Sequence, residues 1–188
     1  MKYFQEEVEC ASREKIKAIQ DEKIVKQVKH AYEHFAHYSN LMDHKGVKPE
    51  DIHGIDYLYK LPFLSKADLR DQYPDGLLAV DKKDVVRIHS TSGTTGKRVI
   101  AYYTENDLEL WSDCTARAIV AAGGSKEDVV QVAYGYGLFT GGMGLHDGAR
   151  KVGCMTLPMS SGNTERQIQF MHDLKSTIYV AHLHMLHI

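Results

Sequence analysis

Cysteine, proline and tryptophan are scarce in this sequence, and it carries no excess of positive charge. Its three cysteines, Cys10, Cys114 and Cys154, lie far apart, which excludes a disulfide framework and a cysteine-based zinc knuckle. The formal net charge of -2 argues against a nucleic-acid-binding surface, which is ordinarily basic. No apolar run approaches the roughly 20 residues of a membrane-spanning helix, and the first residues lack the apolar region of a signal peptide. We therefore expect a cytoplasmic protein in a reducing compartment, with neither a membrane nor a nucleic acid as partner.

The composition changes along the chain, and this change predicts its organisation. The 188 residues are 43% hydrophobic, which is enough for an ordinary globular domain with a sizeable core. Twelve of the 15 glycines fall at or after Gly93. We expect a helical lead-in over residues 1–80, an α/β subdomain over residues 81–178, and an atypical tail over residues 179–188.

The lead-in carries the periodicity of amphipathic helices. Apolar residues recur at near-helical spacing from about residue 12 to residue 38, and Ser65 opens a second helix with a capping-box pattern. His30, His34 and His37 follow one another at spacings of four and three residues, which would also suit metal ligands. No carboxylate pattern accompanies them, so we favour a solvated helix flank and expect no metal site.

The second part of the chain alternates between strands and helices. Thr104 has the pattern of an N-cap for a helix that runs to about Ala122. Residues 129–133 and 154–158 have the apolar character of buried strands, and helices are expected over residues 142–152 and 164–174. Strands that alternate with helices favour a mostly parallel sheet with flanking helices. The predicted fold class is therefore α/β, with a helical N-terminal lead-in.

A loop rich in glycine and hydroxyl groups joins two predicted strands within residues 85–103. Glycine lets the backbone approach an anion closely, N–H and hydroxyl groups donate to its oxygens, and a lysine adds positive charge. The spacing is not that of a Walker A loop. A flexible hairpin loop without a ligand is the alternative. The predicted phosphate-binding residues are Ser90, Thr91, Ser92, Gly93, Thr94, Thr95, Gly96 and Lys97.

Aromatic residues and glycines alternate directly after the predicted strand 129–133. Tyr134, Tyr136, Phe139 and Gly141 follow the carboxyl end of that strand, where ligands bind in open α/β sheets. The intervening glycines would let the backbone approach a flat ring, whereas ordinary core packing of the aromatic rings is the alternative. We expect these four residues to border a substrate pocket. Asn163 is interpreted as the N-cap of the following helix.

Three segments resemble a known family. The run Ser90–Lys97, STSGTTGK, resembles the phosphate loop of the AMP-forming acyl-CoA synthetase superfamily. The segments 134–142, YGYGLFTGG, and 161–167, SGNTERQ, resemble the phenylacetate-CoA ligase branch of that superfamily. One departure is Arg98, where the family commonly has proline. The resemblance extends to about Thr177 and implies part of the large N-terminal domain of adenylate-forming enzymes.

The resemblance implies a ligase that joins phenylacetate or a related aryl acid to coenzyme A, with ATP and Mg²⁺, through an acyl-adenylate. It also implies that the adenine-binding motifs and the catalytic lysine lie beyond residue 188, so no catalytic residue is assigned here. We expect a truncated, inactive portion of such a ligase that forms homo-oligomers. The alternatives are a non-catalytic fragment that binds nucleotide or aryl acid, and a dimerising remnant with a vestigial site.

The final residues, 179–188, depart from the resemblance. Reverse translation with one chosen set of codons, read in a shifted frame, gives the Thr-Pro-Ser-Tyr turn that the family has at this point. A frameshift followed by a premature stop is therefore our hypothesis for the tail and for the length of the chain.

Overall fold

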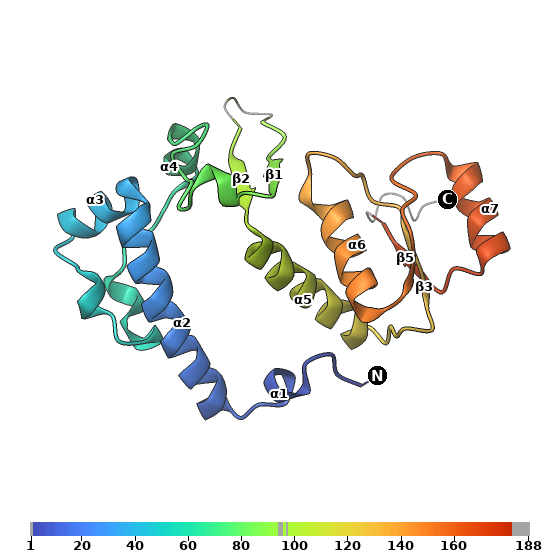
Figure 1. Ribbon diagram of the computed structural model, residues 1–188, viewed down its shortest axis with the longest axis horizontal. Coiled ribbons are helices and arrows are strands. Elements are labelled where there is room, and N and C mark those ends of the chain that lie inside the picture. The colour runs from blue at the N-terminus through green and yellow to red at the C-terminus, as the bar shows by residue number, and fades with distance from the viewer. Residues whose placement is uncertain (1, 94–95, 97, 182–188) are drawn as a thin grey trace. The chain divides into compact units, whose positions relative to one another are not determined.

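The computed structural model describes residues 2–93, 96 and 98–181, and these form two compact units (Figure 1). The helical unit comprises residues 10–102. The sheet unit combines the N-terminal residues through Glu9 with the chain from Tyr103 onward. Within the described residues, no helix is both long and apolar enough to cross a bilayer.

The helical unit begins with two helices instead of the single helix expected over residues 12–38. Helix α2 spans Arg13–His34 and begins at Ser12, whose hydroxyl accepts a hydrogen bond from the backbone N–H of Lys15. Helix α3 spans Ala36–His44. Phe35 between them is extended, with φ −122° and ψ 92°, and only 9% of its surface is exposed. The prediction of one helix was therefore wrong, because burial of the Phe35 ring accompanies a bend that periodicity alone does not reveal.

Short elements and two strands complete this unit. They are η1 (Pro49–Asp51), η2 (Ile55–Lys60), α4 (Lys66–Asp71), η3 (Lys82–Asp84), β1 (Arg87–Ser90) and β2 (Ile100–Tyr103). The predicted capping box at α4 is confirmed, since Ser65 and Asp68 satisfy each other's backbone N–H groups. Strands β1 and β2 pair in a two-stranded sheet, as expected for the ends of the glycine-rich loop. The core of the helical unit consists of Val28, Met42, Val47, Ile52 and Leu61.

The sheet unit has the predicted parallel arrangement. Its central strand β3 (Val129–Val132) pairs in parallel with β4 (Met155–Leu157) on one side and with β5 (Ile178–Val180) on the other. Val130 lies opposite Thr156 and Ile178 and is fully buried. The unit's helices are α1 (Glu6–Glu9), α5 (Glu105–Ala121), α6 (Thr140–Val152) and α7 (Thr164–Leu174). The predicted α/β fold class is confirmed.

Helices α5 and α6 pack closely because α6 presents glycine to α5 (Figure 1). A Cβ atom at Gly144 would collide with the Trp111 ring, and one at Gly148 would collide with the side chain and backbone of Thr115. The Thr115 hydroxyl donates to the Gly144 carbonyl oxygen over 3.0 Å. Any side chain at these two glycines would force the helices apart.

Candidate functional site

The base of the glycine-rich loop is closed by hydrogen bonds between β1 and β2. The backbone N–H of Thr91 donates to the Val99 carbonyl oxygen over 3.1 Å, and the N–H of Val99 donates to the Thr91 hydroxyl oxygen over 3.1 Å. Ser90 is buried, and its hydroxyl donates to the Thr91 carbonyl oxygen over 3.0 Å. Two of the predicted phosphate-binding hydroxyls therefore contribute to the loop's own structure, whereas Ser92 is exposed.

Two glycines give the loop its backbone conformation. Gly93 and Gly96 have φ values of +70° and +119°, which L side chains rarely adopt, and the N–H of Gly96 donates to the Gly93 carbonyl oxygen over 3.1 Å. The Arg98 side chain lies against Gly93, where a Cβ atom would be 2.6 Å from Arg98 Cγ. Arg98 therefore adds a cation beside the loop, a feature that the sequence analysis noted only as a departure from the family. The predicted residues Thr94, Thr95 and Lys97 lie outside the described residues.

Tyr134 and Phe139 of the aromatic segment differ in their surroundings. Tyr134 follows β3, packs against the core of the sheet unit, and places its ring where a Cβ atom at Gly141 would lie. A Cβ atom at Gly142 would be 2.6 Å from the Gly135 carbonyl oxygen. The lack of a side chain at Gly141 and Gly142 therefore leaves room for the Tyr134 ring and for the Gly135 backbone. Phe139 is the N-cap residue of α6 and is 52% exposed, so its ring is accessible.

Tyr136 lies beside His146, a residue to which the sequence analysis gave no role. The Tyr136 hydroxyl oxygen is 3.3 Å from His146 Nδ1, and the two rings meet edge to face with centroids 6.0 Å apart. Burial raises the pKa of Tyr136 to about 12, and the charge of Asp147 adds to this effect. Tyr136 is therefore a neutral phenol at physiological pH, able to donate or accept a hydrogen bond. Tyr136 precedes α6 and His146 lies within it, so no helical spacing in the sequence connects them.

A buried pair of glutamines fixes the turn after β4. Gln131 Nε2 donates to Gln167 Oε1 over 2.6 Å and to the Gln167 carbonyl oxygen over 3.1 Å. Gln167 Nε2 in turn donates to the Ser160 carbonyl oxygen over 2.8 Å. Ser160 has φ +63°, and Ser161 Oγ lies 3.6 Å from the Cβ position of Gly135, so this turn borders the aromatic segment. No pattern in the sequence distinguishes these two glutamines from others.

The predicted residues are thus divided between the two units. The aromatic segment and the turn at residues 160–163 belong to the sheet unit, and the glycine-rich loop belongs to the helical unit. The expected N-cap at Asn163 is confirmed, because its side chain accepts from the N–H of Arg166 over 3.2 Å. Strands β3 and β4 run in parallel, so the segments that follow them leave the same edge of the sheet, the usual position of ligand sites in α/β proteins.

The histidines of the lead-in do not form a three-membered cluster. His30 and His34 stack on α2 with ring centroids 4.5 Å apart, whereas His37 lies on α3 with its Nε2 2.9 Å from Asp68 Oδ1. In the part of the chain that the structure describes, no group of three or more His, Cys, Asp or Glu residues could hold a metal ion.

Comparison with known proteins identifies relatives among the coenzyme A ligases. The phenylacetate-coenzyme A ligase of Aromatoleum evansii is 49% identical over 173 residues, which cover 92% of this chain and 39% of that protein. The enzyme of the same name from Thermus thermophilus is 43% identical over 175 residues, covering 93% of this chain and 39% of the relative. That from Escherichia coli is 46% identical over 168 residues, covering 89% and 38%. No protein-family model matches the chain.

Solved structures show the same fold at low sequence identity. A crystal structure of 2-hydroxyisobutyryl-CoA ligase with 2-HIB-AMP and CoA superposes with a TM-score of 0.86 at 22% identity, over 95% of this chain and 39% of that one. An open conformation of the same ligase gives a TM-score of 0.84 at 22% identity, over 95% and 43% of the two chains. The fold is that of the N-terminal part of a CoA ligase.

The chain is homologous to the N-terminal part, about 40%, of phenylacetate-coenzyme A ligases. This confirms the resemblance found in the sequence. The chain spans 39% of the length of the Aromatoleum evansii relative, so more than half of that protein has no counterpart here.

Proposed function

We propose that this chain supplies the phosphate-binding loop and part of the acyl pocket of an ATP-dependent ligase that joins an aryl acid to coenzyme A. The observation that carries the proposal is the identity of 49% over 173 residues with a phenylacetate-coenzyme A ligase. Because the match covers 92% of the chain, the loop and the aromatic segment both lie within it. Phenylacetate is the substrate with which to test the proposal.

The proposed reaction has two steps. A carboxylate oxygen of the acid attacks the α-phosphorus of ATP, so an acyl–phosphate bond forms and pyrophosphate leaves. The thiol of coenzyme A then attacks the acyl carbon, and AMP leaves. Such chemistry depends on positioning and on stabilisation of negative charge. N–H groups of the loop, the hydroxyls of Ser92, Thr94 and Thr95, and the Lys97 ammonium would hold the phosphates, with Arg98 as a further cation.

Mg²⁺ would arrive with the nucleotide. The described residues hold no group of three side chains able to ligate a metal. Mg²⁺ commonly binds substrate phosphates and keeps several water ligands, so it needs few protein side chains. When bound, the ion would neutralise phosphate charge, and the chain's own loop would orient the phosphate group.

The aromatic segment is proposed to border the acyl group. The exposed Phe139 ring offers an apolar face for an aryl ring, and the neutral Tyr136 hydroxyl offers a hydrogen bond. Tyr134 and Gly141 pack against each other and would shape the wall of the pocket. The turn held by Gln131 and Gln167 lies next to this wall.

Nucleotide binding to the 188-residue chain tests the loop. We expect the chain to bind ATP in calorimetric titration and Lys97→Ala to weaken binding about tenfold, because a hydrogen bond to a charged group contributes about 1.5–3 kcal/mol. Lys126→Ala is the matched control, since its side chain is 75% exposed and lies in the sheet unit. Equal losses in the two variants would contradict the loop's role. Absence of any nucleotide binding would favour the dimerising remnant.

Turnover and acid binding test the rest of the proposal. We expect no pyrophosphate release with ATP and phenylacetate, because more than half of the relatives' length has no counterpart in this chain. Thioester formation by the 188-residue chain would overturn the expectation of an inactive portion. Phe139→Ala should weaken phenylacetate binding and leave ATP binding unchanged, the opposite pattern to Lys97→Ala.

A further inference from the structure

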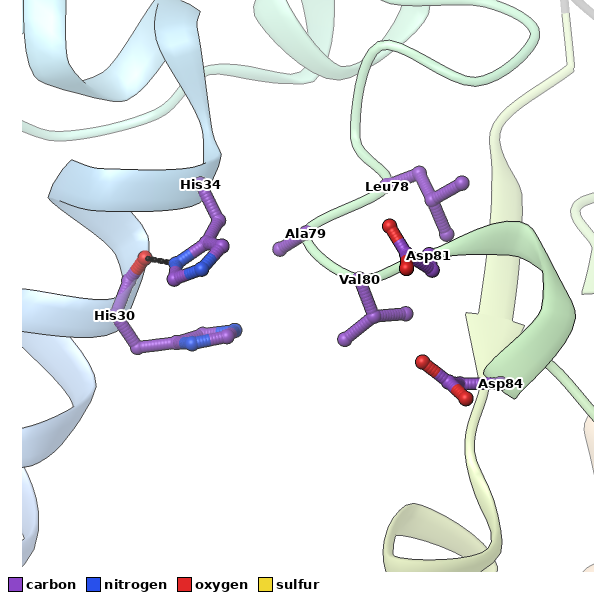
Figure 2. A pocket seen from close by; sticks show the side chains of 7 residues that line it. All are labelled: His30, His34, Leu78, Ala79, Val80, Asp81 and Asp84. Carbon is purple, nitrogen blue, oxygen red and sulfur yellow. Dashed lines mark hydrogen bonds between the residues drawn. The ribbon is translucent and has the colours of Figure 1, made fainter.

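The helical unit contains a hollow that none of the predicted loop or aromatic residues lines. It has a volume of about 440 Å³. Figure 2 shows two imidazole rings reaching into it from α2, with the segment 78–84 on the opposite side. The residues that line the hollow are His30, His34, Leu78, Ala79, Val80, Asp81 and Asp84.

The two imidazoles lie on one helix face, at a sequence spacing that metal ligands use. His30 and His34 are four residues apart, so they project from the same side of α2, and their rings stack with centroids 4.5 Å apart and planes 26° apart. Two histidines at this helical spacing occur together as zinc ligands in helical metal motifs. A partner ring four residues away also lets one ion bridge two turns of the helix.

A hydrogen bond selects the tautomer of His34. Its Nδ1 lies 3.0 Å from the His30 carbonyl oxygen, and a carbonyl can only accept, so Nδ1 carries the proton. Nε2 of His34 therefore has the lone pair that a metal needs. Histidine ligands in metal sites are commonly oriented in this way, through donation from the other ring nitrogen to a backbone carbonyl.

The opposite wall supplies negative charge and an apolar surround. Asp81 and Asp84 carry the carboxylates, and Asp81 is also 2.9 Å from the Lys83 ammonium, so Asp84 is the carboxylate without that neutralising contact. Leu78, Ala79 and Val80 form an apolar part of the lining. A cation in the hollow would gain attraction from the Asp84 carboxylate on the facing wall.

We propose that His30 and His34 form a two-histidine site for a divalent late first-row transition ion, Cu²⁺, Ni²⁺ or Zn²⁺, whose remaining ligands are water molecules, with Asp84 on the facing wall of the hollow. Imidazole suits these ions, and the general affinity order predicts Cu²⁺ above Ni²⁺ and Zn²⁺. The order His-x-x-Glu-His over residues 30–34 also occurs in zinc peptidases. Here the Glu33 carboxylate lies 3.9 Å from the Lys29 ammonium. Among the described residues no third side chain completes a metal-ligating group, so we propose metal binding and no catalysis at this site.

Titration with NiCl₂ tests the site. The reference protein is the 188-residue chain with His182, His184 and His187 changed to asparagine, because these closely spaced histidines would bind Ni²⁺ themselves. We expect one Ni²⁺ per chain in a competition assay with a chromophoric chelator. His30→Ala and His34→Ala should each lower the affinity about tenfold or more, because loss even of an outer-shell partner of a metal ligand costs that much. His172→Ala, an exposed histidine of the sheet unit beside Asp173, should change nothing.

A second measurement needs no change at the site. On addition of substoichiometric Ni²⁺, paramagnetic broadening should remove the NMR signals of the His30 and His34 imidazoles before those of His172.

The contribution of the facing carboxylate is tested separately. Asp84→Asn should lower the affinity two- to threefold at low salt and less at high salt, as expected for a charge acting through water. Equal affinity in the reference protein, His30→Ala and His34→Ala, or broadening that begins at another histidine, would overturn the proposal.

Discussion

The two units of the molecule are stabilised in different ways. In the sheet unit, Val130, Val132 and Ala149 have no exposed surface, and two helices meet through glycine. The helical unit has a buried core as well, in which Met42 has no exposed surface, and it also carries exposed ion pairs such as that of 2.7 Å between Lys48 and Asp43. Exposed ion pairs contribute about 0–1 kcal/mol each, whereas a well-packed core is sensitive to a single methyl group. Substitutions in the close contact of α5 with α6 should therefore be costlier than substitutions at the exposed ion pairs.

Glycine serves different purposes in α6 and at the end of α3. Ten of the 15 glycines belong to the sheet unit, and those of α6 face other parts of the chain at close range. In the helical unit, Gly46 has φ +68° and its Cβ position is open, so it serves the backbone conformation that ends α3. Glycine permits close packing in α6 and a turn at the end of α3.

The largest effect is expected where the sheet unit buries polar groups. Gln131→Leu should lower the free energy of unfolding by about 3 kcal/mol, because it removes three hydrogen bonds and takes a partner from the buried Gln167 and from the half-buried Ser176. Urea unfolding followed by Trp111 fluorescence reports on this unit, since Trp111 is the chain's single tryptophan and packs against Gly144.

The matched control for that variant is Gln169→Leu, on the exposed face of α7. It should change stability by less than about 0.5 kcal/mol. Similar losses in the two glutamine variants would show that the buried network contributes nothing specific.

Close packing of α5 on α6 gives the next largest effect. Gly148→Ala should cost about 2 kcal/mol, because the new methyl group meets the Thr115 side chain and backbone, which are fixed in α5. Gly54→Ala in the helical unit meets only the Asp21 side chain and should leave the Trp111 transition unchanged. If Gly148→Ala stabilised the protein, as an exposed helical alanine would, the close-packing account of α6 would fail.

Local signals in the sequence predicted much of the fold, whereas long-range packing could not be predicted. The capping boxes at Ser65 and Thr104 and the buried strand β3 depend on neighbouring residues, and all three were predicted. The bend at Phe35 depends on tertiary burial, so periodicity predicted one helix where two exist.

The candidate site shows the same limit. The alternation of glycine and aromatic residues indicated that some group lies close to the backbone of this segment, but the sequence does not identify that group. At Gly141 it is the chain's own Tyr134 ring. The partnership of Gln131 with Gln167 joins residues 36 positions apart, and that of Tyr136 with His146 depends on the packing of α6, so neither pattern could have been found in the sequence.

Helix caps should have equal effects in the two units, which sharpens the comparison. Ser65→Ala in the helical unit and Thr104→Ala in the sheet unit each remove the side chain that accepts a backbone N–H at a helix start. Each should cost about 1 kcal/mol. Amide hydrogen exchange of Asp68 and Asp107 should accelerate by similar factors, since both N–H groups lose the same kind of acceptor. A much larger effect at Thr104 would mean that caps depend on the packing around them.

The smallest effect concerns the charge of Asp68 in the helical unit. Three donors surround its carboxylate: the Ser65 hydroxyl, the Ser65 backbone N–H over 2.7 Å, and His37 Nε2 over 2.9 Å. In that order of importance, they lower its pKa to about 2 from 3.8. Because the folded-state pKa is the lower one, this stabilisation is complete above about pH 4 and is lost as the pH falls from about 4 to about 2. Carbon-13 NMR of the carboxyl group should give a midpoint near 2, and Asp68→Asn should flatten the pH dependence of α4 amide exchange in that window. A midpoint near 3.8 would show that the three donors do not favour the charged form, and that the surface interactions of the helical unit contribute less than its geometry suggests.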